Sequence, residues 1–322
     1  MKLQLARFSI ASMAVALCAS ALAQVYPGKP VRWIVPYPPG GSTDIIARTI
    51  GQKLAEAWSI QVIIDNRPGA SGMIGTDLVA KSAPDGYTLV NITSSHVLHP
   101  SLYRQVPFDT IKDFTPVILL VRSPNLICVH PSLPVRSIGE LIALARARPG
   151  KLSYGIGGLG SSNHLIGEMF KAAAKVDMTP IPYKGSAPAT AALLSDEIQM
   201  FFDNGSTALG HIRGGRLRGL GLAAKARIGA LPEVPTFDEG GIANFYSGVP
   251  HGVFVPAGTP APIIATINAV INAVFQEPDY RRIVTQAGTN IAGGEPQQLT
   301  AYLAAEKKKW QPLILKQNIK AY

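Results

Sequence analysis

Cysteine is almost absent from this chain of 322 residues, which contains only Cys18 and Cys128. Because Cys18 falls in a segment that we predict to be removed, Cys128 would be the only thiol of the mature chain. A single thiol excludes an internal disulfide, so an exported chain must be stabilised by its hydrophobic core alone. The sequence around Cys128 gives no reason for a reactive thiol, and we expect it to be buried and inert.

Aromatic residues are scarce at 7%, and charged residues make up only 16% of the chain. Hydrophobic residues reach 47% without any low-complexity tract, which indicates a globular protein rather than a disordered one. The net charge of +10 includes basic clusters at Arg213–Arg218 and Lys307–Lys309. These clusters lack interleaved aromatic residues, so we expect solvated surfaces and no nucleic-acid partner.

Motifs for catalysis and for metal binding are missing. The chain has no G-x-S-x-G, Walker or H-E-x-x-H sequence. His96 and His99 have no carboxylate or cysteine at metal-ligand spacing nearby, so we expect neither a metal nor another cofactor. The enzymatic alternative, an exported hydrolase, has no motif in its favour, and we do not expect an enzyme.

The N-terminus has the features of an export signal. Lys2 and Arg7 precede an apolar run over Phe8–Ala19, and small residues at 21 and 23 suit a signal peptidase. The run is too short to span a bilayer of ~30 Å. We therefore predict that residues 1–23 form a signal peptide, cleaved before Gln24, and that the mature chain acts in the periplasm.

Two other N-terminal arrangements were weighed against this prediction. One is an uncleaved membrane anchor, which the short apolar run disfavours. The other is a lipoprotein with Cys18 as the lipidated residue. Leu17 is bulkier than the small residue that such sites require before the cysteine.

From Val31 the chain alternates short apolar runs with helical periodicity. The first series predicts strands at 31–35, 61–64 and 87–93, with helices at 44–58 and, more weakly, 71–82. The second predicts strands at 126–129, 152–154, 179–182 and 199–203, with helices at 138–147, 163–175 and 187–194. Apolar stripes predict two C-terminal helices, over 263–274 and 299–310.

This order of elements predicts parallel sheets covered by helices on both faces. Two such series suggest two lobes with a ligand cleft between them. We expect residues 24–122 and 231–322 to form lobe 1, and residues 123–230 to form lobe 2.

Two glycine-rich turns lead from a strand into a helix, one in each series. The first is Pro38–Asp44, and the second runs from Gly155 through the hydroxyl and amide side chains that end at Asn163. Free backbone N–H groups and the positive end of a helix dipole make such turns suitable for anions. Simple helix capping is the alternative, and it is the favoured role for Asp44.

Residues Gly155–Gly160 also fit the dinucleotide-binding pattern G-x-G-x-x-G. The preceding strand is short, however, and the next strand, near Ile181, carries no acid for a ribose. An exported protein would also rarely meet NAD. We therefore retain the anion-binding chemistry of the turn without a nucleotide.

Six segments of the chain resemble the Bug family, the substrate-binding proteins of tripartite tricarboxylate transporters. They are Tyr26–Arg32, Pro38–Asp44, Asn66–Gly72, Ala83–Leu89, Tyr183–Pro188 and Pro256–Pro260. They occur in the family's order and span essentially the whole mature chain. The resemblance implies an α/β, two-lobed periplasmic-binding-protein fold of type II, each lobe a mainly parallel sheet flanked by helices.

The resemblance also implies a function and a site. It predicts capture of a small organic carboxylate by a monomer that serves the membrane components of a transporter. In the family, the loops matching Pro38–Thr43 and Gly160–Asn163 hold a ligand carboxylate. The expected ligand-binding residues are Tyr37, Pro39, Gly40, Gly41, Ser42, Thr43, Ser95, Gly160, Ser161, Ser162, Asn163, Tyr183, Ala187 and Asp203.

Two points stay open at the level of sequence. An orphan receptor that presents its solute to a sensor protein would have the same cleft. The family often has Trp before the residue matching Gly252, whereas this chain has His251, and Met73 replaces a frequent Asn. The identity of the carboxylate therefore does not follow from the resemblance.

Overall fold

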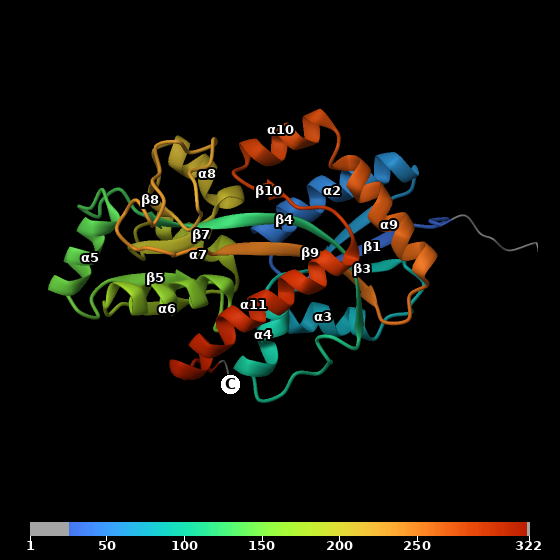
Figure 1. The fold of residues 1–322 in the computed structure, drawn as a ribbon, viewed down its shortest axis with the longest axis horizontal. Helices are drawn as coiled ribbons and strands as arrows, with labels where there is room; N and C mark the ends of the chain where they lie inside the picture. The colour runs from blue at the N-terminus through green and yellow to red at the C-terminus, as the bar shows by residue number, and fades with distance from the viewer. Residues whose placement is uncertain (1–25, 321–322) are drawn as a thin grey trace, which may run out of the picture.

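The computed structural model describes residues 26–320. The predicted signal peptide and its cleavage site lie outside these residues. Figure 1 shows two α/β lobes side by side, connected by two long strands that run through both. This arrangement confirms the predicted two-lobed α/β fold.

Lobe 1 is built on three parallel strands. Strand β1 pairs with β2 on one side and with β3 on the other. The helices around them include one helix, α4, that the sequence did not predict. The bounds are β1 (Val31–Val35), α2 (Ser42–Trp58), β2 (Val62–Asn66), the 3₁₀ turn η1 (Ala70–Gly72), α3 (Met73–Ala80), β3 (Thr88–Ile92) and α4 (Ser95–Leu102).

Two antiparallel strands connect the lobes. Strand β4 (Phe114–Val129) pairs along its first part with β9 (Gly248–Pro256) and along its second part with β7 and β8. The sequence predicted only residues 126–129 of β4 and no strand at β9. Pro116 and Pro124 lie within β4, and Pro116 is beside a register irregularity, where a missing N–H is tolerated.

Lobe 2 repeats the pattern of lobe 1. Strand β5 pairs in parallel with β6 and β7, whereas β7 and β8 are antiparallel to β4. All strands join one ten-stranded sheet, with the main order β2-β1-β3-β9-β4-β7-β5-β6. The bounds are α5 (Ile138–Ala147), β5 (Ser153–Ile156), α6 (Ser162–Ala174), β6 (Thr179–Pro182), α7 (Ser186–Leu194), β7 (Met200–Asn204), α8 (Gly205–Arg213) and β8 (Arg218–Leu222).

The C-terminal segment returns to lobe 1. Helix α9 (Ala261–Val274) packs beside α2, and α11 (Pro296–Lys316) lies across β4 and α4 (Figure 1). Between them are α10 (Pro278–Gln286) and the short strand β10 (Asn290–Ile291), which pairs with β4. Both predicted C-terminal helices are confirmed, and α11 is longer than predicted.

The core lies on both faces of the sheet. Ile50 and Leu54 of α2 pack with Trp33 of β1 and Ile271 of α9, and all four side chains are fully buried. Cys128 is also fully buried, and this burial raises the pKa of its thiol. The expectation of an inert thiol agrees with this environment, because the thiolate is the reactive form.

The lobe boundaries remain a prediction, and we propose one adjustment. The segment 231–247 packs on lobe 2: Thr236 bridges Leu222 of β8, and the Phe237 ring lies 6.0 Å from that of Phe170 in α6. These contacts support returning the chain to lobe 1 at Gly248, where β9 begins. Within residues 26–320, no helix combines the length and apolarity needed to cross a membrane.

Candidate ligand-binding pocket

A small cavity of about 50 Å³ lies between the lobes, where the two glycine-rich loops meet. It is walled by short polar and backbone-rich segments of both lobes. The lining residues are Tyr37, Pro38, Gly41, Ser42, Thr43, Ser71, Thr93, Ser95, Gly157, Ser161, Ser162, Asn163, Gly185, Ser186, Asn204 and Val249.

The N-terminal ends of five helices contribute to this wall. Helices α2, α4, α6, α7 and α8 each place the first residue of the helix, or the residue just before it, on the cavity. The first N–H groups of a helix have no intrahelical acceptor, and the helix dipole makes this end positive. The pocket is therefore surrounded by unpaired donors and by partial positive charges.

No Asp, Glu, Lys, Arg or His is among the sixteen lining residues, all of which belong to the described part of the chain. Nine of the sixteen carry a hydroxyl group, and these hydroxyls can donate or accept. An anion in this pocket would meet backbone N–H groups and hydroxyls in place of a cationic side chain. Such charge-assisted hydrogen bonds are stronger than neutral ones.

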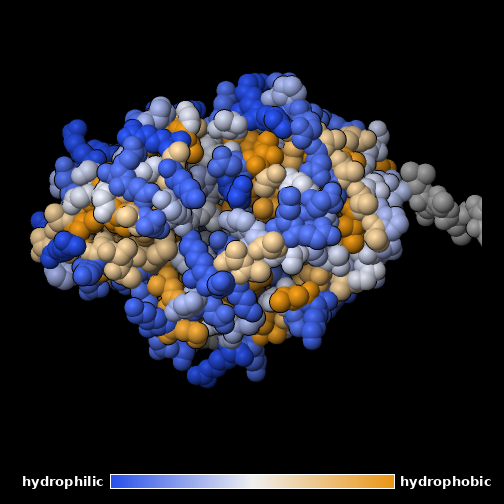
Figure 2. Space-filling model, viewed as in Figure 1, coloured by the Kyte–Doolittle hydropathy of each residue, from blue (hydrophilic) through white to orange (hydrophobic). Residues whose placement is uncertain are grey.

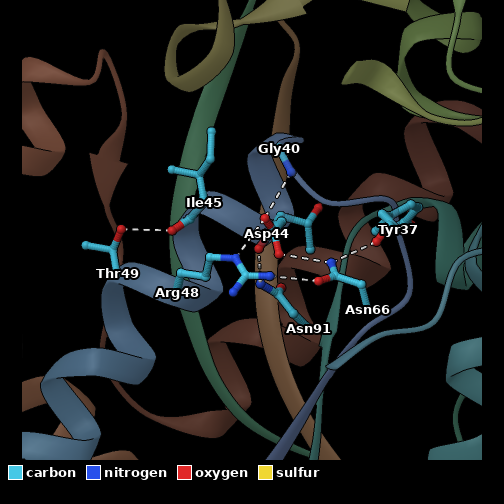
Figure 3. A network of polar contacts seen from close by, with 9 residues as sticks. Tyr37, Gly40, Asp44, Ile45, Arg48, Thr49, Asn66 and Asn91 are labelled. Atoms are coloured by element: carbon cyan, nitrogen blue, oxygen red, sulfur yellow. Dashed lines mark hydrogen bonds and ion pairs between the residues drawn. The ribbon is translucent and has the colours of Figure 1, made fainter. Parts of the chain in front are cut away.

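The first loop is held in place by Asp44, which does not line the cavity and takes part in the polar network of Figure 3. Its Oδ2 accepts from the Gly40 N–H at 2.9 Å and from Arg48 Nε at 3.0 Å, while Oδ1 accepts from Asn66 Nδ2 at 2.9 Å. Asn66 Nδ2 also donates to the Tyr37 carbonyl at 3.0 Å. Asp44 thus fixes both ends of the turn between β1 and α2.

The negative charge of Asp44 is compensated by the neighbouring Arg48. Burial raises the pKa of Asp44, but the hydrogen bonds from Arg48, Gly40 and Asn66 outweigh this effect and keep the pKa below its ordinary value. The carboxylate is therefore ionised at neutral pH and paired with the Arg48 guanidinium. An anion in the pocket meets the helix end rather than an uncompensated negative charge.

Three hydroxyl groups form a closed triangle on the lobe 1 wall. Tyr37 Oη lies 3.0 Å from Thr93 Oγ1 and 2.9 Å from Ser95 Oγ, and these two are 2.9 Å apart. Burial raises the pKa of Tyr37, so its phenol stays protonated. The triangle fixes the orientation of hydroxyls that border the cavity.

The second loop uses its side chains partly for its own structure. Ser161 is the N-cap of α6, and its Oγ accepts from the His164 N–H at 3.3 Å. The Asn163 side-chain amide donates to the Phe202 carbonyl, and its Oδ1 accepts from Ser186 Oγ at 3.4 Å. Ser162 has no such internal bond among the described residues, so its hydroxyl is available to a ligand.

The lobes touch each other next to the cavity. Ser71 Oγ and Tyr103 Oη, both in lobe 1, donate to the Leu159 carbonyl of lobe 2 at 3.1 and 3.2 Å. Gly160 lies so close to Leu102 of α4 that a methyl group on Gly160 would be 2.6 Å from Leu102 Cδ1. The structure is therefore one in which the two lobes are closed over the pocket.

Eight of the fourteen predicted site residues line the cavity, namely Tyr37, Gly41, Ser42, Thr43, Ser95, Ser161, Ser162 and Asn163. The other six do not line it. Pro39 and Gly40 are exposed, and Gly160 donates its N–H to His164 Nδ1. Ala187 lies one residue into α7 beyond the lining Ser186. The ligand-binding role of all fourteen remains a prediction.

Tyr183 and Asp203 complete the set of six. Tyr183 donates its hydroxyl to Glu197 Oε1 at 2.8 Å, and Glu197 does not line the cavity. Asp203 is fully buried at the end of β7 and accepts from Thr190, Thr207 and the Asn204 N–H. Burial raises the pKa of Asp203 to about 6 in spite of these hydrogen bonds. Asp203 therefore fixes the start of α8 from below the pocket.

Sequence reasoning missed the lining residues Ser71, Thr93, Ser186 and Asn204. Asn204 and Ser186 follow a strand or turn and begin helices α8 and α7, so their polar character before an apolar run was a usable signal. Ser71 and Thr93 carry no comparable signal. Their place in the wall depends on how the lobes meet.

The neighbouring histidines His96 and His99 pack in the core. His96 and His99 lie among aromatic rings, and burial lowers their pKa values to about 3 and about 4. The Nε2 atom of each donates to a backbone carbonyl, that of Thr110 for His96 and that of Ser71 for His99. Over residues 26–320 there is no cluster of three or more metal-ligating side chains.

His251, which departs from the family pattern, does not line the cavity, and neither does Lys184, the charged residue next to Tyr183. His251 is fully buried in β9, and neither ring nitrogen has a hydrogen-bond partner among the described residues. Burial lowers its pKa to about 3. Lys184 is exposed.

The fold and the pocket define a solute-binding protein, with two α/β lobes closed over a polar site for a small molecule. A sequence profile described as "Tripartite tricarboxylate transporter family receptor" matches residues 46–319. The chain belongs to this family, the Bug family expected from the sequence motifs. Because this is a family of receptors, the chain is a solute-binding receptor and not an enzyme.

Individual relatives agree with the family assignment. The protein BugT of Bordetella pertussis is 36% identical over 300 residues, which cover 92% of each chain. The solved structure of R. palustris Rpa4515 with adipate is 35% identical, covers 92% of this chain and 99% of its own, and superposes with a TM-score of 0.89. MatC from Rhodopseudomonas palustris with bound malate is 30% identical, covers 90% of this chain and 100% of its own, and has a TM-score of 0.85.

Proposed function

We propose that this receptor captures a small organic carboxylate in the periplasm and delivers it to the membrane components of a tripartite tricarboxylate transporter. The carboxylate is held by backbone N–H groups and hydroxyls at the helix ends that meet in the pocket. Two related structures, which contain adipate and malate, support this class of ligand. The predicted monomeric state is part of this proposal.

The convergence of five helix N-termini on a pocket without a charged side chain carries the proposal. Exposed donors and dipole ends favour a negative group over a neutral or positive one. The pocket has no carboxylate that would select an amine and no aromatic face, apart from Tyr37, that would select a flat apolar solute. The periplasmic location rests on the predicted export signal and on the family.

A thermal-shift screen of mono-, di- and tricarboxylates identifies the ligand, since saturation at ~100 times the Kd stabilises by ~2.7 kcal/mol. Thr43→Val and Ser162→Ala then test the site by calorimetry. Each removes a hydroxyl that borders the cavity, and a hydrogen bond to a charged group contributes about 1.5–3 kcal/mol. Each variant is expected to weaken binding by about tenfold or more.

Thr49→Val is the matched control for Thr43→Val. Thr49 lies in the same helix, α2, and its hydroxyl donates to the Ile45 carbonyl away from the pocket (Figure 3). The ligand affinity of Thr49→Val is expected to equal that of the wild type. Normal affinity in both pocket variants would show that these hydroxyls do not hold the ligand.

A further inference from the structure

A second cavity, of about 430 Å³, lies where β4, the end of α11 and the segment after β8 meet. We refer to it as the rear cavity. Its lining is polar and aromatic and comes from five separate parts of the chain. The lining residues are Arg122, Pro124, Ala223, Lys225, Tyr246, Ser247, Gly248, Asn290, Tyr302, Glu306 and Lys309.

The rear cavity is on the opposite face of the connecting strands from the candidate pocket. Arg122 of β4 pairs with Pro250 of β9, so these two side chains share a face of the sheet. Val249, which lines the pocket, precedes Pro250 and therefore points to the other face. Figure 2 shows the α11 face as a mainly hydrophilic surface with small, scattered hydrophobic groups. The two cavities are separate sites.

Three basic side chains line the rear cavity. Arg122, Lys225 and Lys309 form no ion pair within 4.0 Å in the part of the chain that the structure describes. The Arg122 guanidinium lies 5.9 Å from the centre of the Tyr302 ring, and Lys225 Nζ lies 5.9 Å from that of Tyr246. These aromatic faces orient the cations without neutralising them.

Glu306 is the only carboxylate among the described residues that line the cavity, and one of its two oxygens is occupied by hydrogen bonds. Its Oε2 accepts from Ser94 Oγ at 3.0 Å and from Trp310 Nε1 at 2.9 Å. Three cations against one carboxylate leave a formal charge of +2 on the lining. Like charges that share a cavity repel one another, and an entering anion would relieve this repulsion.

We propose that the rear cavity binds a small oxyanion with two or more negative charges, such as phosphate, sulfate or a dicarboxylate. Arg122 offers a planar fork of N–H donors, and the two lysines add point charges from other directions. Lys309 already donates to the Tyr246 carbonyl, so its ammonium group is fixed at the edge of the cavity.

The anion would connect the lobes. Under the proposed division, Arg122 and Lys309 belong to lobe 1, whereas Lys225 and Tyr246 belong to lobe 2. A bound anion would therefore restrain the connection between the lobes from the face opposite the pocket. Any solute that changes the angle between the lobes would change the affinity for this anion. By the same coupling, the anion would change the affinity for the solute.

Calorimetric titration with inorganic phosphate, and separately with sulfate, tests the site at constant ionic strength balanced with chloride. The triple variant Arg122→Gln/Lys225→Gln/Lys309→Gln is expected to bind both anions about tenfold more weakly than the wild type, or worse. The control triple variant Arg148→Gln/Lys307→Gln/Lys308→Gln removes the same charge from exposed or partly exposed positions outside the cavity. It is expected to bind phosphate within about twofold of the wild type.

Thr43→Val separates this site from the pocket. Unchanged phosphate affinity in Thr43→Val supports the rear cavity, whereas a loss equal to that of the triple variant would place the anion in the pocket and overturn the proposal. A wild type that binds neither anion beyond chloride would overturn it as well. So would an equal loss of affinity in the control triple variant.

Discussion

We expect Gly160→Ala to hinder closure of the lobes while leaving the other properties of the pocket unchanged. Gly160 has φ of +75°, a left-handed conformation that costs a residue with a side chain about 1–2 kcal/mol. This cost is independent of the ligand. The added methyl group would also lie 2.6 Å from Leu102 Cδ1 and 3.3 Å from Leu102 Cγ, across the boundary between the lobes. This overlap exists only when the lobes are closed.

The size of the effect follows from Leu102, which is 3% exposed and packed in the core. Overpacking of a filled site costs about 1–3 kcal/mol. At ~1.4 kcal/mol per decade, the Kd of Gly160→Ala is expected to rise by about 5- to 150-fold. Calorimetry with the carboxylate found in the screen measures this change.

Gly215→Ala is the control for backbone strain. Gly215 has φ of +68°, close to that of Gly160, and an added methyl group there would have no neighbour within 4 Å. Both variants should lose similar stability without ligand, but only Gly160→Ala should lose affinity. Equal affinity in the two variants would refute the reasoning, because the ligand would then not require the lobes to be this close.

Two further predictions concern the dependence of stability on pH, measured by urea unfolding at pH 5 and 7. Folded His251, with its pKa lowered to about 3, binds no proton at pH 5, whereas the unfolded residue does, so stability falls as the pH falls. Between pH 7 and pH 5, His251→Phe is expected to lose about 2 kcal/mol less stability than the wild type. An equal loss in both proteins would show that folded His251 accepts a proton. Asp203, with its pKa raised to about 6, contributes in the opposite direction, because its stabilisation as the neutral acid is lost as the pH rises through 6. Asp203→Asn is expected to remove about 1 kcal/mol of the loss between pH 5 and 7, and an identical pH profile would contradict the burial of an ionisable acid.

Local periodicity was sufficient to predict the helices and short strands that pack against a single neighbouring layer. The apolar stripe of α2 and the short strands of both lobes follow from spacing and from flanking Gly and Pro residues. The long strand β4 was mostly missed because Pro116 and Pro124 interrupt it. Its pairing with β9 involves residues distant in sequence, so no local pattern reports it.

The same distinction applies to the pocket. The two glycine-rich loops were predicted from residue chemistry alone, and both border the cavity. Asp44 was expected to act as a helix cap or dipole partner, and no local pattern showed that Asn66, the last residue of β2, would donate a hydrogen bond to its carboxylate. The contributions of α7 and α8 depend on the sheet, which brings the ends of several strands to one edge.

The pairing of β4 with β9 has a consequence for the order of folding. Strands β3 and β4 both form hydrogen bonds with β9, which comes much later in the chain than either of them. Until residues 248–256 arrive, the sheet of lobe 1 has two unpaired edges, and such edges are prone to wrong pairing with other chains. Closing a loop that contains all of lobe 2 is also slow, because distant contacts form late. Lobe 2 can therefore assemble first from its own local units, and lobe 1 is completed around it.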